Sequence, residues 1–198
     1  MMTSSITLGG IRDIDLGFRV LEESKEPLLP STRDIGVSLP GKHGQYDFGA
    51  DLTERAFSYS CAFVSDGTNY DMPSAAGLQQ RVRTLARHLT DSYGRPRTLE
   101  LRRAFEPDKF YLVRYAGSAS LERLIYNSIG MFELELVAFD PFAYSVQEHI
   151  TEQVITSSPT TLQIQVDGNI RSEAVIVLTN TGLTSLTQFR ITNQYLLE

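Results

Sequence analysis

Apolar and polar residues alternate with a period of two over much of this chain, as they do in β-strands that bury one face. The segment Gly130–Phe139 shows the alternation most clearly, because its apolar residues Phe132, Leu134 and Leu136 are separated by two glutamates. The same reasoning predicts strands earlier in the chain. They are two short strands within Ile6–Val20 and longer ones over Ala56–Phe63, Thr98–Arg103 and Lys109–Tyr115.

The strand over Ala56–Phe63 contains the only cysteine of the chain. Cys61 shares one face of this strand with Phe57, Tyr59 and Phe63, since side chains two residues apart point the same way. We therefore interpret Cys61 as a small core residue, and a single cysteine cannot form an internal disulfide. The preceding stretch Glu22–Pro30 is charged and contains two prolines, which predicts a loop.

Between Pro73 and Asp91 the period changes to that of a helix. The apolar residues follow one another at intervals of four, three and four: Leu78, Val82, Leu85 and Leu89. Ser74 is a suitable N-cap, and Gly94 followed by Pro96 ends the element.

The opposite face of this helix is basic. It carries Arg81, Arg83, Arg87 and His88. Such a face contacts nucleic acid or an acidic neighbour in some proteins, but a solvated face near the helix C-terminus is the interpretation that we prefer.

An extended arm is predicted over Asp34–Gly49. Its bend lies at Gly41–Gly44, where glycine can adopt the positive φ of a tight hairpin. Tyr46 and Phe48 are expected to anchor the arm by burying their rings, and Asp47 to cap a turn or to pair with a basic neighbour. A two-stranded ribbon is marginal in water by itself, so such an arm is expected to pair with something else.

The strand over Lys109–Tyr115 places Arg114 on the same face as Phe110 and Leu112. An arginine on an otherwise apolar face needs a partner, because an unpaired buried charge is costly. The carboxylates that could provide the pair are Asp47, Glu106 and Asp140. Such a pair would lock one domain or would join two subunits, and we favour the lock.

After the strand that ends at Asp140-Pro141, Phe142 and Tyr144 are expected to pack back under the sheet as the chain leaves the domain. Residues 146–161 are rich in Thr, Ser and Gln and are predicted to be a linker. Residues 162–198 then contain three more predicted strands: Leu162–Val166, Ala174–Thr179 and Leu186–Ile191. This region is too short for a complete β-sandwich, which takes about 100 residues.

Composition and charge argue against some classes of function. The 198 residues carry a formal charge of −6, which argues mildly against a surface built to grip DNA. If the chain lined a channel, the same charge would let DNA pass, but we prefer the interpretation that it maintains solubility. No apolar stretch is long enough for a membrane helix, and the first residues do not have the pattern of a signal peptide, so we expect synthesis in a cytoplasm.

Catalytic chemistry finds little support in the sequence. The three histidines, His43, His88 and His149, have no metal-binding spacing, and Gly9-Gly10 lacks the rest of a phosphate-binding motif. Glu133 and Glu135 share a strand face, where two carboxylates can act as acid and base, but such a pair is far more often a solvated edge. We expect no catalytic residue, no cofactor and no metal, and hence no enzyme.

Three segments instead join turn residues to aromatic anchors: Leu39–Gly49, Glu106–Gly117 and Phe139–Ser145. In this order and spacing, from about Ile6 to Ser145, the chain resembles the N-terminal domain of the distal tail protein of bacteriophages with long, non-contractile tails. The resemblance implies an α+β, mainly β fold. Residues 1–145 would form a split-barrel-like antiparallel ring domain with one helix and a projecting hairpin arm. A small or truncated galectin-like sandwich region would follow over residues 162–198.

The resemblance also implies a function. The chain would be a structural protein of the virion tail tip, made in the bacterial host, that forms a hexameric ring between tail tube and adhesion device and lets DNA pass. Its partners would be further copies of itself, the tail tube protein, the tail-tip protein and a receptor-binding protein, without specific nucleic-acid binding or a membrane.

Within this reading, the hairpin arm is expected to reach the adjacent subunit. The predicted interface residues are Pro40, Gly41, Lys42, His43, Gly44, Gln45, Tyr46, Asp47, Phe48 and, less strongly, Arg114. The alternative function is a carbohydrate-binding β-module, which requires two or three aromatics on one open face. After Tyr144, only Phe189 and Tyr195 are aromatic.

Overall fold

The computed structural model describes residues 5–22, 24–63, 75–124, 129–166, 168–170, 172 and 174–194. The chain divides into two compact units, Met1–His149 and Ile150–Glu198. Each unit is described by itself below.

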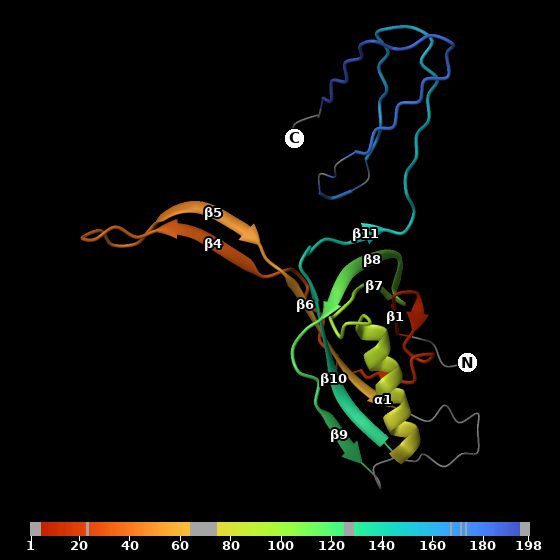
Figure 1. The fold of residues 1–198 in the computed structure, drawn as a ribbon. Coiled ribbons are helices and arrows are strands. Elements are labelled where there is room, and N and C mark those ends of the chain that lie inside the picture. The colour runs from red at the N-terminus through yellow and green to blue at the C-terminus, as the bar shows by residue number, and fades with distance from the viewer. Residues whose placement is uncertain are drawn as a thin grey trace. The chain divides into compact units, whose positions relative to one another are not determined.

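The described residues of the first unit form eleven strands and one helix (Figure 1). The strands are β1 Ile6–Leu8, β2 Ile11–Arg12, β3 Arg19–Val20, β4 Thr32–Val37, β5 Tyr46–Leu52, β6 Arg55–Phe63, β7 Thr98–Arg103, β8 Glu106–Tyr115, β9 Leu121–Leu124, β10 Ile129–Ala138 and β11 Tyr144–Ser145, and the helix is α1 Ala75–Leu89.

Nine of the strands belong to one antiparallel sheet in the order β2-β1-β7-β8-β10-β6-β3, with β9 paired to β10 and β11 paired to β8. The sheet curls, and α1 lies against its inner face (Figure 1). This arrangement confirms the predicted α+β, mainly β fold with one helix on an antiparallel sheet.

The longest run of paired residues in the described sheet joins β6 to β10. Nine residue pairs run without interruption from Arg55↔Ala138 to Phe63↔Gly130. The alternation seen in the sequence is reproduced, because Phe132, Leu134 and Leu136 are buried whereas the glutamates between them are exposed. Across β6, the four residues predicted to share a face are all buried: Phe57, Tyr59, Cys61 and Phe63.

Helix α1 covers the inner face of this sheet with Leu78, Leu85 and Leu89, which are buried in the same core. On the sheet side of that core, the rings of Phe63 and Phe132 stack with centroids 4.6 Å apart. Burying such large side chains is the main stabilising contribution to a domain of this size. The helix, predicted over 73–91, ends at Leu89, before the Gly94 turn. Its predicted cap, Ser74, lies outside the described residues.

One part of the helix prediction is wrong. Arg83 and Arg87 are exposed as expected, but Arg81 and His88 are half-buried, and His88 Nε2 lies 2.9 Å from the Leu8 carbonyl oxygen in β1. The reason is geometric, because β1 passes beside the last turn of α1 and its backbone needs a partner there.

No helix among the described residues is long and apolar enough to span a membrane.

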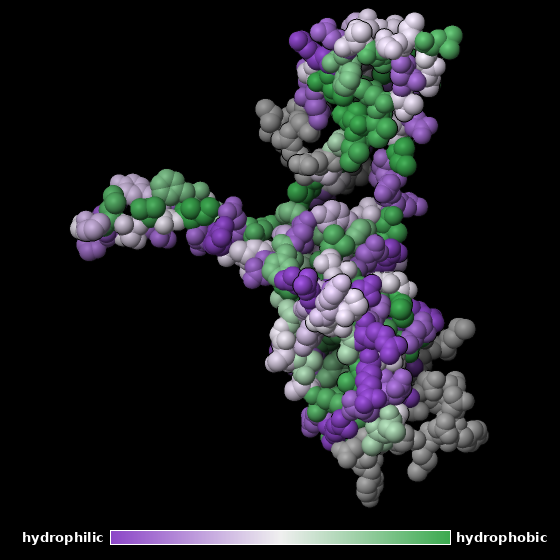
Figure 2. Space-filling model, viewed as in Figure 1, coloured by the Kyte–Doolittle hydropathy of each residue, from purple (hydrophilic) through white to green (hydrophobic). Residues whose placement is uncertain are grey.

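The second unit corrects three strand predictions. Its described residues, from 150 to 194, form neither helix nor strand, and all of them are exposed. The alternating segments Leu162–Val166, Ala174–Thr179 and Leu186–Ile191 are therefore not strands here. Alternation creates two faces, but a strand also needs a hydrogen-bonded neighbour and a covered apolar face. Figure 2 shows the apolar residues of this unit at its surface.

Candidate subunit interface

The predicted arm exists as a two-stranded sheet of its own. β4 pairs only with β5, and every residue of both strands is exposed (Figures 1 and 2). The rings of Tyr46 and Phe48 are therefore not buried as the sequence suggested, and Phe48 is 67% exposed. A ribbon this thin has no core in which to bury them.

The register gives the arm two different faces. Val37 pairs with Tyr46, so Ile35 and Phe48, each two residues away, extend the same apolar face. The opposite face carries Asp34 and Asp47, because Gly36 pairs with Asp47 and Asp34 with Ala50. The arm thus offers one apolar face and one acidic face, and the residues of both faces are exposed.

The tip of the arm is ordered by local contacts. Gly41 and Gly44 have φ values of 82° and 81°, which confirms the predicted position of the bend. The Lys42 ammonium lies 3.3 Å from the centroid of the Tyr46 ring. Asp47 Oδ1 accepts a 2.8 Å hydrogen bond from the Gly49 N–H, so Asp47 caps a turn, one of the two roles predicted for it.

The base of the arm is tied to the large sheet. The Thr53 N–H donates a 2.7 Å hydrogen bond to the Ser31 carbonyl oxygen and closes the ribbon. Arg55, the first residue of β6, donates through Nη2 to the Pro27 and Leu28 carbonyl oxygens at 2.8 and 3.1 Å. These bonds hold the loop before β4 against the strand that follows β5.

A second anchor of the same loop is Glu26, the residue before Pro27. Arg103 Nη1 donates a 2.9 Å hydrogen bond to Glu26 Oε2, and Arg103 Nη2 contacts Glu106. The Tyr59 hydroxyl donates a 2.8 Å hydrogen bond to Glu26 Oε1. Lys109 approaches Glu106 at 3.3 Å and completes the cluster, in which only a tenth of the Arg103 side chain is exposed.

This cluster shifts the pKa values of Glu106 and Tyr59 in opposite directions. Partial burial of Glu106 opposes its ionisation, but the hydrogen bonds from Arg103 and Lys109 outweigh that cost, and the pKa of Glu106 lies below its ordinary value. Burial raises the pKa of the Tyr59 phenol, and the adjacent Glu26 carboxylate raises it further. The cluster therefore holds a carboxylate ionised and a phenol neutral, which suits a structural lock.

Arg114 differs from its prediction. It lies on the exposed face of β8, and its guanidinium stacks over the Phe139 ring at 4.4 Å from the centroid. In the part of the chain that the structure describes, it forms no ion pair. Glu106 is engaged by Arg103 and Lys109, and Asp140 accepts hydrogen bonds from the Phe142 N–H and the Tyr144 hydroxyl. The lock within one domain that we favoured is therefore not formed by Arg114. Its long side chain reaches water on this outer face, so no carboxylate is required there.

Aromatic residues surround Arg114 on this face. Phe110 and Leu112 precede it on the same side of β8, and Tyr144 of β11 pairs with Phe110, with ring centroids 5.7 Å apart. Together with Phe139, which is 61% exposed, they form what we call the β8 patch: Phe110, Leu112, Arg114, Phe139 and Tyr144. Phe110 is half-buried, and the other members are exposed. An exposed group of aromatic residues with an arginine is typical of protein–protein interfaces.

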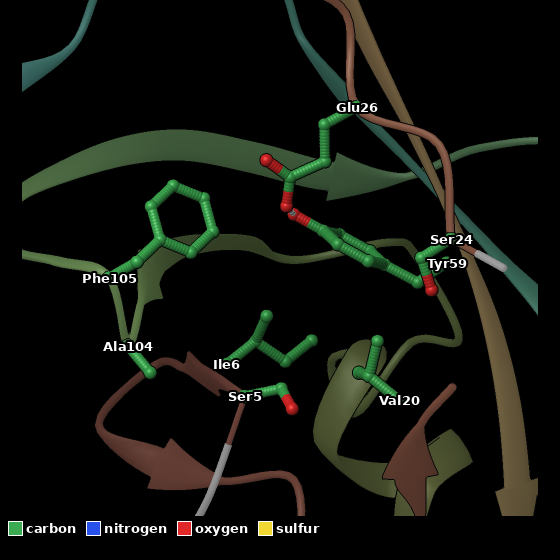
Figure 3. Close-up of a pocket in the computed structure, with 8 residues that line it drawn as sticks. All are labelled: Ser5, Ile6, Val20, Ser24, Glu26, Tyr59, Ala104 and Phe105. Carbon is green, nitrogen blue, oxygen red and sulfur yellow. Dashed lines mark hydrogen bonds between the residues drawn. The ribbon is translucent and has the colours of Figure 1, made fainter. Parts of the chain in front are cut away.

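The structure also contains an open pocket of about 480 Å³ next to the Arg103 cluster (Figure 3). The residues that line it are Ser5, Ile6, Val20, Ser24, Glu26, Tyr59, Ala104 and Phe105. Its one ionisable carboxylate, that of Glu26, is already bonded to Tyr59 and Arg103. The pocket can take an apolar group, but its acid is committed to the fold.

The other candidate residues are scattered. His43 lies in the arm turn and His149 at the end of the first unit, and both are exposed, as are Glu133 and Glu135 on the outer face of β10. No group of three or more potential metal ligands occurs among the described residues. Of the two aromatics on which a sugar site after Tyr144 would depend, Phe189 is exposed, and Tyr195 lies outside the described residues.

The nine predicted interface residues from Pro40 to Phe48 thus lie together on the arm, whereas Arg114 lies on the other sheet. Sequence reasoning missed Glu26 and Arg103, which contact each other across 77 residues. It also missed Asp13, a buried carboxylate that accepts hydrogen bonds from the Ile14 and Ser5 N–H groups at 2.9 and 3.3 Å. A charged residue beside a turn gives no local sign of such partners.

Comparison with known proteins places this geometry in context. The model of a family described as phage tail protein RIFT-related domain matches residues 14–138, which include the arm, α1 and β10. Among solved structures, the fold is similar to that of the SPP1 Dit (gp 19.1) protein, described as a paradigm of the hub adsorption apparatus in phages that infect Gram-positive bacteria. The TM-score is 0.56 at 19% sequence identity, over 73% of this chain and 53% of that chain. The chain therefore spans about half the length of that protein. No curated protein matches it.

Proposed function

The chain belongs to the family of phage tail proteins with a RIFT-related domain, and from this we propose that it forms the ring at the distal end of a long, non-contractile tail. Members of this family are structural components of the virion tail rather than enzymes. The fold shared with a hub protein of the adsorption apparatus supports the more specific role. The proposed ring contains six copies and joins the tail tube to the adhesion device.

One observation carries this proposal: every residue of the arm strands β4 and β5 is exposed, and no other described strand pairs with them. A free two-stranded ribbon with an apolar face is only marginally stable in water, and it gains stability once a second surface covers that face. Firm anchoring of its base by Arg55 and Thr53 restricts the directions in which it can extend. Because the free arm is already restricted in this way, it loses less conformational entropy when it binds.

Ring formation follows from the asymmetry of such a contact. An arm on one copy meets a different surface on the next, so the contact is heterologous, and heterologous contacts close into a ring when the rotation between copies allows it. In the proposed hub, the tail tube protein contacts one face of the ring and the tail-tip protein contacts the other. A receptor-binding protein joins the same assembly.

The charge of the chain suits a channel for DNA. Six copies with a formal charge of −6 each form an acidic ring. Such a wall repels phosphate groups, so DNA passes without binding to it.

The oligomeric state tests the proposal directly. Light scattering coupled to size exclusion is expected to give the mass of six 22.2 kDa chains, and negative-stain images are expected to show six-fold rings. A species that remains monomeric at the highest soluble concentration would count against the ring.

A further inference from the structure

We propose that the β8 patch of one copy receives the arm of the next copy, and that Arg114 of the patch pairs there with Asp47 of the arm. This inference rests on the proposed ring. It identifies the surface of the second copy that the arm contacts and the charge pair that orients it.

The β8 patch has the properties of an acceptor surface. Its rings are held in place before any partner arrives, by the Phe110–Tyr144 stack at 5.7 Å and by the Arg114–Phe139 contact at 4.4 Å. A preformed surface loses little side-chain entropy on binding. Arginine and aromatic residues also dominate the energetically important positions of interfaces.

The charges point to Asp47. Of the three carboxylates that the sequence offered to Arg114, Glu106 and Asp140 are engaged within their own sheet. Asp47 remains, and in the described residues it has no basic partner. Its Oδ1 caps the Gly49 N–H, which leaves Oδ2 to accept a hydrogen bond from a guanidinium.

The arm complements the patch in charge. Between residues 32 and 52 it carries three aspartates against one arginine and one lysine. Two of these aspartates, Asp34 and Asp47, share the face of the arm that lies opposite to Phe48. This acidic face therefore meets the surface that carries Arg114, and this combination favours association of unlike surfaces over pairing of two arms.

Two single substitutions test the pair with little disturbance of the fold. Asp47→Asn removes the charge but keeps an oxygen that can accept the Gly49 N–H, and Arg114→Gln removes the charge from an exposed position. We expect each to raise the concentration for half-maximal ring formation about tenfold. Because the two residues act as one pair, the double variant is expected to assemble no worse than either single variant. Mass photometry over a concentration series measures this midpoint.

Matched controls remove the same charges elsewhere. Asp34→Asn lies on the same face of the arm, and Arg87→Gln lies on the outer face of α1. Both positions are exposed, and the proposal uses neither. Their midpoints are expected to stay near the wild-type value.

Cross-linking locates the contact independently. Gln45 lies over Gly36, on the same face of the arm as Asp47. The variant with Gln45→Cys and Leu112→Cys, treated with a short bismaleimide, is expected to give a ladder of covalent oligomers, and Gln45→Cys with Arg87→Cys is not. Cys61 is buried, so the native thiol does not interfere.

The outcomes separate this inference from the ring itself. Rings of the wild-type chain with unchanged midpoints for Asp47→Asn and Arg114→Gln would overturn the pair and leave the ring proposal intact. A cross-link confined to single chains would overturn the contact between copies. A wild-type chain that never assembles would overturn both proposals.

Discussion

Arg103 Nη1 lies 2.9 Å from Glu26 Oε2, and this bond joins the last residue of β7 to the loop that leads into the arm. Both side chains are largely shielded from water, with exposed fractions of 10% and 25%. The contact is therefore screened less than a surface ion pair. It fixes the start of the arm to the sheet and also holds Glu26 against Tyr59.

Substitution of Arg103 should destabilise the first unit. Arg103→Met leaves Glu26 and Glu106 facing each other without their shared cation, and we expect a loss of about 2 kcal/mol in the free energy of unfolding, less than a fully buried pair because part of the cluster reaches water. Urea denaturation followed by circular dichroism measures this loss.

The adjacent residue provides the control. Arg102 pairs with Glu100 at 2.6 Å, but both side chains are about 40% exposed, so Arg102→Met is expected to cost less than about 1 kcal/mol. Equal losses for the two variants would show that the Arg103 cluster stabilises the fold no more than an exposed ion pair does.

The acid sensitivity of the fold should depend on Glu106. Its folded-state pKa is depressed, so ionised Glu106 stabilises the fold above its unfolded-state pKa, near 4.5, and this contribution is lost as the pH falls through the lower folded-state value. The urea midpoint of Glu106→Gln should therefore change less than that of the wild type below about pH 4.5.

Glu133→Gln serves as the comparison for this pH series, because Glu133 is exposed on β10 and forms no ion pair among the described residues. The change in its urea midpoint below about pH 4.5 is expected to match that of the wild type. A Glu106→Gln curve parallel to both would contradict the role assigned to this carboxylate.

Shortening the arm should separate assembly from folding. Deletion of His43–Gln45 removes the second half of the turn between β4 and β5, and no residue of these strands is buried. We expect fewer rings by light scattering at an unchanged melting temperature, because the core under α1 is untouched.

His149→Ser removes an exposed histidine outside the arm and is expected to assemble normally. If the deletion instead removes the helical circular dichroism signal, the arm contributes to the core and is wrongly assigned as an interface.

Local patterns of the sequence were sufficient for the elements that carry their own period. The stripe from Leu78 to Leu89 predicted α1, and the alternation at Phe132, Leu134 and Leu136 predicted β10 with the correct buried face. The two glycines of the arm turn marked its bend. These features depend on residues a few positions apart, so their physical causes are visible in the sequence itself.

Residues 162–191 show where such patterns fail. They alternate as β10 does, yet the described residues there form no strand. β10 has β6, β8 and β9 as neighbours and α1 over one face, whereas the later segments have no paired strand in the described part of the chain. Alternation alone does not provide the hydrogen-bonding partner that a strand requires.

The sequence by itself therefore determined the helix, the main strands, the arm and its bend, and it placed the chain near a family of tail proteins. Only the tertiary structure decided that the Tyr46 and Phe48 rings stay exposed, that His88 bonds to β1, and that Arg103 rather than Arg114 forms the internal lock. Each of these depends on which distant segments meet. Long polar side chains such as that of Arg103 can reach several partners, and the packed backbone selects one of them.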